Sequence, residues 1–168
     1  MKKTLKTTSK ICLIVSAVIC AALILLQLVP NWTYQNTETK SEETISVLEY
    51  FAFTYDRPDV TNYFKSNIKQ FNINDLASTF AITFFLGIAS IILVVLKSDK
   101  LWISVFPFAV GCSSLIGLLT NPLWKLGNMY IISVILSAVL AICSLIAVVI
   151  WFIDIRNCFI DPKKLASK

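Results

Sequence analysis

The chain has 168 residues, of which 57% are hydrophobic, and a formal net charge of +5 with no histidine. Soluble domains are usually about 45–50% apolar, so this composition favours a membrane protein. Without histidine, the chain has neither the commonest general base nor a catalytic group of the Ser-His-Asp or Cys-His kind.

The apolar residues are concentrated in four long stretches with almost no charge. At 1.5 Å per residue, each stretch can cross a hydrocarbon core of about 30 Å as an α-helix. The sequence therefore predicts an all-α membrane protein, a bundle of four transmembrane helices at 11–29, 79–96, 101–120 and 129–153. The first stretch follows a basic segment, 1–10, but it exceeds the roughly 7–15 apolar residues of a signal peptide, so we interpret it as an uncleaved helix.

Basic residues are distributed unevenly around these predicted helices. Ten of the 15 lie in the N-terminal segment 1–10, in the short connection 97–100 and in the C-terminal tail 154–168. The loop 30–78 instead holds seven carboxylates against four basic residues. Because basic residues favour the cytoplasmic side, we expect cytoplasmic N and C termini and a long first extracellular loop.

The positive charge is split among three segments that are each expected to lie next to the membrane. It therefore indicates that the chain interacts with anionic lipid headgroups rather than with nucleic acid. Thirteen lysines against two arginines are typical of a low-GC bacterial genome. We therefore expect a multi-pass protein of the plasma membrane, specifically a bacterial cytoplasmic membrane. Trp32 and Trp124 follow the outer ends of helices and are expected to anchor the outer interface.

The extracellular loop is predicted to form two short amphipathic helices. The sequence TKSE at 39–42 matches a capping box that would start the first helix, and DRPD at 56–59 would end it. Apolar residues recur every three or four positions in the two helices: Ile45, Leu48, Ala52 and Tyr55, then Val60, Phe64, Ile68 and Phe71. Asn74 or Asp75 is expected to cap the second transmembrane helix.

Two interpretations of this loop remain open. Its apolar faces could lie on the membrane surface or on the tops of the helices. Alternatively, its aromatic residues form a partner-binding surface, since aromatic side chains are enriched at interfaces. The candidate residues for that surface are Tyr50, Phe51, Phe53, Tyr55, Tyr63 and Phe64.

No motif in the chain indicates catalysis, a cofactor or a metal. CxxC, HExxH, Walker and GxGxxG patterns are absent, and no ionisable side chain other than cysteine lies in the middle of a predicted span. Ion and proton pathways normally use such charges. Gln27 and Asp154 are placed at the membrane interfaces. We expect a protein that is not an enzyme, with no catalytic, cofactor-binding or metal-binding residues.

Small residues at four-residue spacing predict a seam where helices pack closely. The seam residues are Ala109, Gly111, Ser113 and Gly117 in the third helix and Ser133, Ser137 and Ala141 in the fourth. Pro107 is expected to kink the third helix near its cytoplasmic end.

The favoured hypothesis is a non-catalytic small membrane protein that acts through helix packing and loop contacts. It would be an accessory, assembly or immunity-type subunit that binds another membrane protein or a second copy of itself. The alternative is a small transporter or channel component for a neutral or lipophilic solute, with Pro107, Gly111, Ser113 and Ser114 along its path. A surface enzyme using the loop carboxylates ranks last, because those residues fit a solvated face.

Overall fold

The computed structural model describes residues 2–36, 39–53, 62–63, 66, 73–96, 101–120 and 127–160, without the side chains of 2–6, 52–53, 73–76 and 155–160. Within these residues, four helices are long and apolar enough to cross a membrane: Thr7–Leu28, Ala77–Val95, Trp102–Thr120 and Tyr130–Asp154. The chain is therefore a mostly helical, multi-pass membrane protein, as its apolar stretches predicted.

The first span belongs to helix α1, Lys2–Leu28, which begins before the predicted apolar stretch. The second span is one continuous helix made of α4, Ile73–Ala81, a π-helical segment η1, Ile82–Leu86, and α5, Gly87–Val95. Because this helix begins at Ile73, Asn74 and Asp75 lie inside its first turn, and their predicted capping position was wrong.

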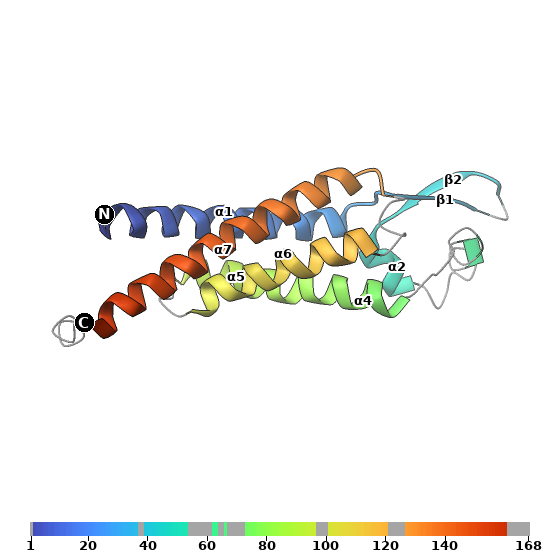
Figure 1. Cartoon of the computed structure of the whole chain (residues 1–168). Helices are drawn as coiled ribbons and strands as arrows, with labels where there is room; N and C mark the ends of the chain where they lie inside the picture. The colour runs from blue at the N-terminus through green and yellow to red at the C-terminus, as the bar shows by residue number, and fades with distance from the viewer. Residues whose placement is uncertain are drawn as a thin grey trace.

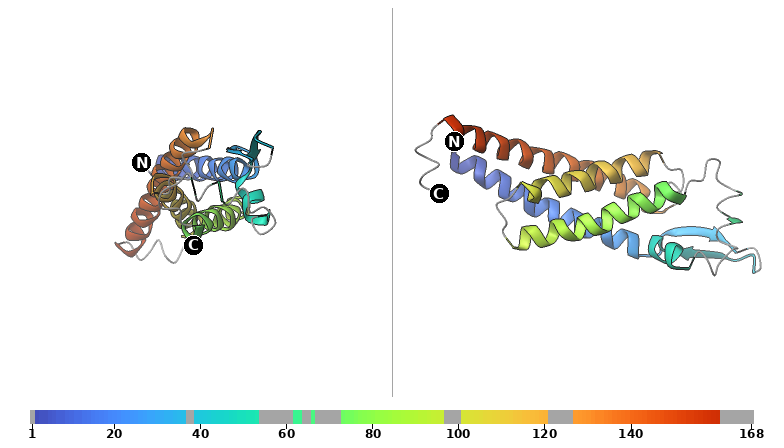
Figure 2. Two further views of the ribbon diagram at one scale, coloured as in Figure 1. Left: turned by 90° about the vertical axis from the view of Figure 1, so that its right-hand side faces the viewer. Right: turned by 90° about the horizontal axis from the view of Figure 1, so that it is seen from below.

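Helix α6, Trp102–Thr120, is the most buried of the four spans and continues without a break through Pro107. Of the residues in its apolar stretch, 44% are buried, against 22–28% in the other three. Helix α6 packs against α7, α5 and η1, and α1 packs against α7 and α5. Figure 2 shows this arrangement along the bundle and from its end.

Helix α7, Tyr130–Ile160, is 31 residues long and crosses the bundle obliquely (Figure 1). It ends at the same end of the bundle where α1 begins, while the described part of the first loop covers the opposite end (Figure 1). An even number of membrane crossings requires this placement, because it returns the chain to its starting side.

A β-hairpin in the first loop was not predicted. Strand β1, Trp32–Gln35, pairs antiparallel with β2, Glu42–Ile45, so that Trp32 lies opposite Ile45 and Gln35 opposite Glu42. The Asn36 N–H donates to the Ser41 carbonyl at 3.0 Å, and Lys40 adopts a left-handed backbone conformation with φ of 54°. The loop was predicted to form two short amphipathic helices; its described residues between 31 and 53 instead form a hairpin followed by one helix.

Helix α2, Val47–Phe53, starts at a capping box later in the sequence than the predicted one. The Ser46 N–H donates to Glu49 Oε2 at 2.8 Å, and the Glu49 N–H donates to Ser46 Oγ at 3.0 Å. The capping box predicted at 39–42 was wrong because residues 42–45 satisfy their backbone groups by strand pairing. The second predicted loop helix, built on Val60, Phe64, Ile68 and Phe71, lies outside the described residues.

Candidate functional site

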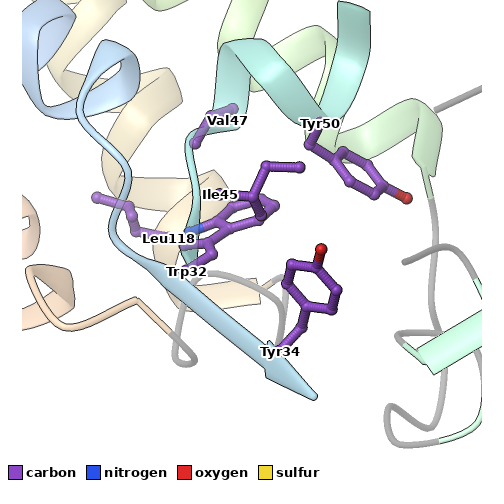
Figure 3. Close-up of a cluster of buried hydrophobic side chains, with 6 residues drawn as sticks. All are labelled: Trp32, Tyr34, Ile45, Val47, Tyr50 and Leu118. Carbon is purple, nitrogen blue, oxygen red and sulfur yellow. The ribbon is translucent and has the colours of Figure 1, made fainter. Parts of the chain in front are cut away.

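The hairpin and α2 form a compact structure on the end of the bundle, here termed the cap (residues 31–53 with 127–128). Its hydrophobic core consists of Trp32, Tyr34, Ile45, Val47, Tyr50 and Leu118. Figure 3 shows that β1, β2 and α2 contribute the first five side chains, and Leu118 comes from α6. Phe80, Tyr130 and Val134 pack against this core. The cap therefore shares its core with the helix ends.

Trp32 is the centre of this core rather than an interfacial anchor. Only 1% of its surface is exposed, so the expectation that it lies at the lipid interface was wrong. Trp32 also forms an antiparallel bridge with Gly127, and the Asn128 N–H donates to the Asn31 carbonyl at 3.1 Å. A Cβ on Gly127 would lie 3.1 Å from Trp32 Cδ1. This close approach joins β1 to the residues that precede α7.

Aromatic contacts continue from the cap core into the second span. The ring centroids are 5.9 Å apart for Trp32 and Tyr50, 5.7 Å for Tyr50 and Phe51, and 5.3 Å for Phe51 and Phe80. Phe80 in turn stacks on Phe84 at 5.6 Å. Since such pairs contribute about 0.5–1.5 kcal/mol each beyond burial, they fix the cap against the adjacent half of the bundle.

The six aromatic residues proposed for partner binding differ in how far they are buried. Tyr50 is 1% exposed, so its assignment to an exposed binding surface was wrong. Phe51 is half-buried against Phe80, and Tyr63 is half-buried with its ring edge-on to Tyr34. The side chains of Phe53, Tyr55 and Phe64 lie outside the described residues. Formation of the cap therefore buries aromatic surface that had been predicted to bind a partner.

A small pocket with a mixed apolar and polar lining lies beneath the cap, between the ends of the spans that meet it. Its volume is about 30 Å³. The polar residues that line it are Gln27 of α1, Asn31, Thr79 of α4, Thr83 of η1, Ser114 of α6 and Ser133 of α7. Leu23, Trp32, Leu118 and Gly127 are among the other lining residues. The pocket is thus the point at which the cap and all four spans meet.

Gln27 is the pocket residue with an unsatisfied polar atom. Its side chain is 6% exposed, one residue before the end of α1. The Oε1 atom is buried and has no hydrogen-bond partner among the described residues. A buried amide oxygen without a partner costs about 1–3 kcal/mol, and this one belongs to a residue that lines the pocket.

Two contacts join the second span to α6 on the opposite side of the pocket. Thr83 Oγ1 and Ser114 Oγ are 2.6 Å apart in a buried hydrogen bond. One turn away, a Cβ on Gly117 would lie 2.6 Å from Thr79 Cγ2, so glycine is needed for the helices to approach. Hydrogen bonds and small residues of this kind hold helices together in lipid.

The other residues of the proposed seam are placed as follows. Gly111 lies against Ala141, because a Cβ at Gly111 would stand 2.7 Å from the Ala141 nitrogen and 2.9 Å from its Cα. Ser137 is fully buried, whereas Ala109 and Ser113 are half-buried. The half-buried Ser133 donates its hydroxyl to the Met129 carbonyl at 3.0 Å. The small residues therefore serve at least two different interhelical contacts.

The residues suggested for a transport path are not brought together around the pocket. Of Pro107, Gly111, Ser113 and Ser114, only Ser114 is among the lining residues. Pro107 and Gly111 are buried in helix packing. At the position of Gly111, the space that a solute would need is filled by the backbone of α7.

The described part of the chain contains no cluster of three or more His, Cys, Asp or Glu residues able to hold a metal ion. Cys12, Cys20, Cys112 and Cys143 are free thiols. Glu43, one of the loop carboxylates considered for catalysis, accepts from Tyr34 Oη at 2.6 Å and from Asn36 Nδ2 at 2.8 Å. These bonds give Glu43 a structural role in the hairpin.

Sequence reasoning missed Gln27, Thr79 and Thr83 as site residues. Thr79 and Thr83 are four positions apart and so fall on one helix face, where hydroxyl groups interrupt an otherwise apolar surface. Ser114 and Gly117 have the complementary spacing on α6. Polar or small residues at the same spacing on two helices are thus the sequence signal that indicates this contact.

Comparison of the chain with models of protein families, with curated protein sequences and with solved structures found no match.

Proposed function

We propose that this protein is a non-catalytic accessory subunit that binds another membrane protein, or a second copy of itself, through the outer surface of its cap. The observation that carries this proposal is the way the cap is built. Its aromatic residues form an internal core that is continuous with the helix ends. The cap is thus a preorganised platform, and preorganised surfaces lose less entropy when they bind.

Among the described side chains of the hairpin and α2, the exposed ones are mostly polar, with Leu48 as a large apolar exception. Gln35, Glu42 and Thr44 are exposed on the hairpin, and Leu48 of α2 is 41% exposed. A leucine surrounded by polar groups resembles the pattern of protein interfaces, in which an apolar centre is bordered by a polar rim. The pocket of about 30 Å³ offers no comparable space for a metabolite, which supports surface recognition over small-molecule chemistry.

Photo-crosslinking in the native membrane tests this function. A photoreactive residue at Leu48 is expected to give one adduct of discrete mass, and the Thr44→Arg substitution should abolish it. The matched control is Ile142 of α7, which is 59% exposed and faces lipid in the proposed arrangement. A chain that is strictly monomeric in mild detergent and yields no adduct from Leu48 contradicts the proposal.

We further propose that the cap is extracellular and both chain ends are cytoplasmic in a bacterial plasma membrane. The support is the distribution of basic residues in the sequence, because ten of the 15 lie in segments 1–10, 97–100 and 154–168, and basic residues favour the cytoplasmic side. A Thr44→Cys variant should then react with a membrane-impermeant maleimide on intact cells. A Lys3→Cys variant should react only after permeabilisation, and the reverse result would invert the orientation.

A further inference from the structure

The unsatisfied Gln27 oxygen and the pocket beside it point to a ligand that is not part of the chain. Two other buried hydroxyls, those of Ser16 and Ser137, also have no partner among the described residues. Neither of these serines lines the pocket. Gln27 therefore differs from them in having both an unsatisfied acceptor and adjacent space.

The volume of the pocket decides what class of ligand it can take. One water needs roughly 10–15 Å³ on this measure, so the 30 Å³ pocket has room for about two water molecules. A sugar, an amino acid or a polyol is several times larger. The described residues that line the pocket carry no charge, so they offer a bound ion no countercharge.

The polar groups around the pocket suit water as both donor and acceptor. Gln27 Oε1 accepts only, so the ligand must donate a hydrogen bond to it. Thr83 Oγ1 and Ser114 Oγ share one hydrogen between them at 2.6 Å, which leaves the second hydroxyl hydrogen available. A water molecule between these groups and Gln27 would connect α1 with η1 and α6.

We propose that the pocket is a water-binding site in which about two ordered water molecules donate to Gln27 Oε1 and connect α1, the second span and α6 beneath the cap. The waters satisfy the amide oxygen, and buried waters in proteins typically make about three such bonds. This inference is independent of the proposed function, because it concerns the interior of the bundle and not its outer surface.

Radiolytic hydroxyl-radical footprinting of the detergent-solubilised chain, with water as the probe, tests the site. The radicals form from water, so a buried side chain is modified only when a water molecule lies beside it. Leu23 and Leu118 line the pocket and are 4% and 3% exposed, whereas Leu140 is 0% exposed and does not line it. We expect Leu23 and Leu118 to be modified several-fold faster than Leu140.

The Gln27→Met substitution removes the acceptor while keeping the length of the side chain. Modification of Leu23 should then fall to the rate of Leu140, while Leu140 itself stays unmodified and reports an intact fold. If the variant does not fold, the comparison of the leucines in the native chain still decides the question. Equal, low modification of Leu23, Leu118 and Leu140 in the native chain overturns the proposal, as does unchanged labelling of Leu23 in a folded Gln27→Met chain.

Discussion

The cap and the helical bundle bury their side chains by opposite rules. In the bundle, large apolar residues such as Val18, Phe85 and Ile142 face outward, while Ser114 and Thr83 lie inside. In the cap, aromatic residues lie inside and polar ones such as Glu42 face outward, as in a soluble protein. The two regions are exposed to different solvents, and each places its large apolar surface away from water.

This difference implies that different forces hold the two regions together. The cap depends on the hydrophobic effect, because its aromatic surface is removed from water. Lipid provides no comparable driving force between helices, so the bundle depends on close packing and interhelical hydrogen bonds. Substitutions of the same kind should therefore have unequal effects in the two regions.

The largest effect is expected from Trp32→Ala in the cap. Replacing a fully buried tryptophan by alanine typically lowers the free energy of unfolding by about 3–5 kcal/mol. Because the cap and the helix ends share one core, the bundle should be destabilised as well. The measurement is the melting temperature in detergent together with protease cleavage within the cap. Trp102→Ala is the matched control, because Trp102 is 55% exposed at the other end of α6. If Trp32→Ala leaves the melting temperature of the bundle unchanged, the cap and bundle are independent units.

A smaller but still large effect is expected from Gly111→Val in the bundle. The new Cβ would collide with the backbone of Ala141, and overpacking of this kind usually costs about 1–3 kcal/mol. The fraction of monodisperse protein and its melting temperature should both fall. Ala109→Val, at a half-buried position on the same helix, should change little. Equal behaviour of the two variants would show that α6 and α7 do not touch at Gly111.

The smallest effect is expected from Ser46→Ala, which removes the side-chain oxygen that caps α2. Such a change typically costs about 1 kcal/mol, because the Glu49 N–H loses its acceptor. Faster hydrogen exchange at residues 47–50 should accompany it, with no change in the bundle helices. The exposed Ser41→Ala serves as the control. Unaltered exchange in α2 would mean that the tertiary packing of Val47 and Tyr50 alone maintains the helix.

The two regions also differ in how far the sequence predicted them. The spans were predictable because membrane thickness sets a minimum length of apolar chain, and four stretches met it. Their inner faces were harder to predict, since Gln27, Thr79 and Thr83 acquire their roles only when three helices meet. Spacing alone also grouped Gly111 with Gly117, although Gly111 faces Ala141 and Gly117 faces Thr79.

The cap was mispredicted because two capping boxes compete within a few residues of each other. The patterns TKSE at 39–42 and SVLE at 46–49 both match the local rule. The choice between them depends on strand β1, which precedes the first pattern and pairs with residues 42–45. A capping-box pattern does not take strand pairing into account, so it predicted a helix start that lies too early in the sequence.

The π-helical segment at Ile82–Leu86 has a consequence for how this chain tolerates length changes. A π turn accommodates one residue more than an α turn, and successive residues of an α-helix are about 100° apart around its axis. Before the segment, Thr79 faces α6, and after it, Gly87 faces Ile24 of α1. Deleting the one extra residue there would convert the segment to a regular α-helix and leave the residues beyond it on their present faces, because the wider turn already absorbs that residue. Converting the segment to a regular α-helix without a deletion would instead turn everything beyond it by about 100°. The second span therefore keeps its contacts with both neighbours only while the π-helical segment holds its extra residue.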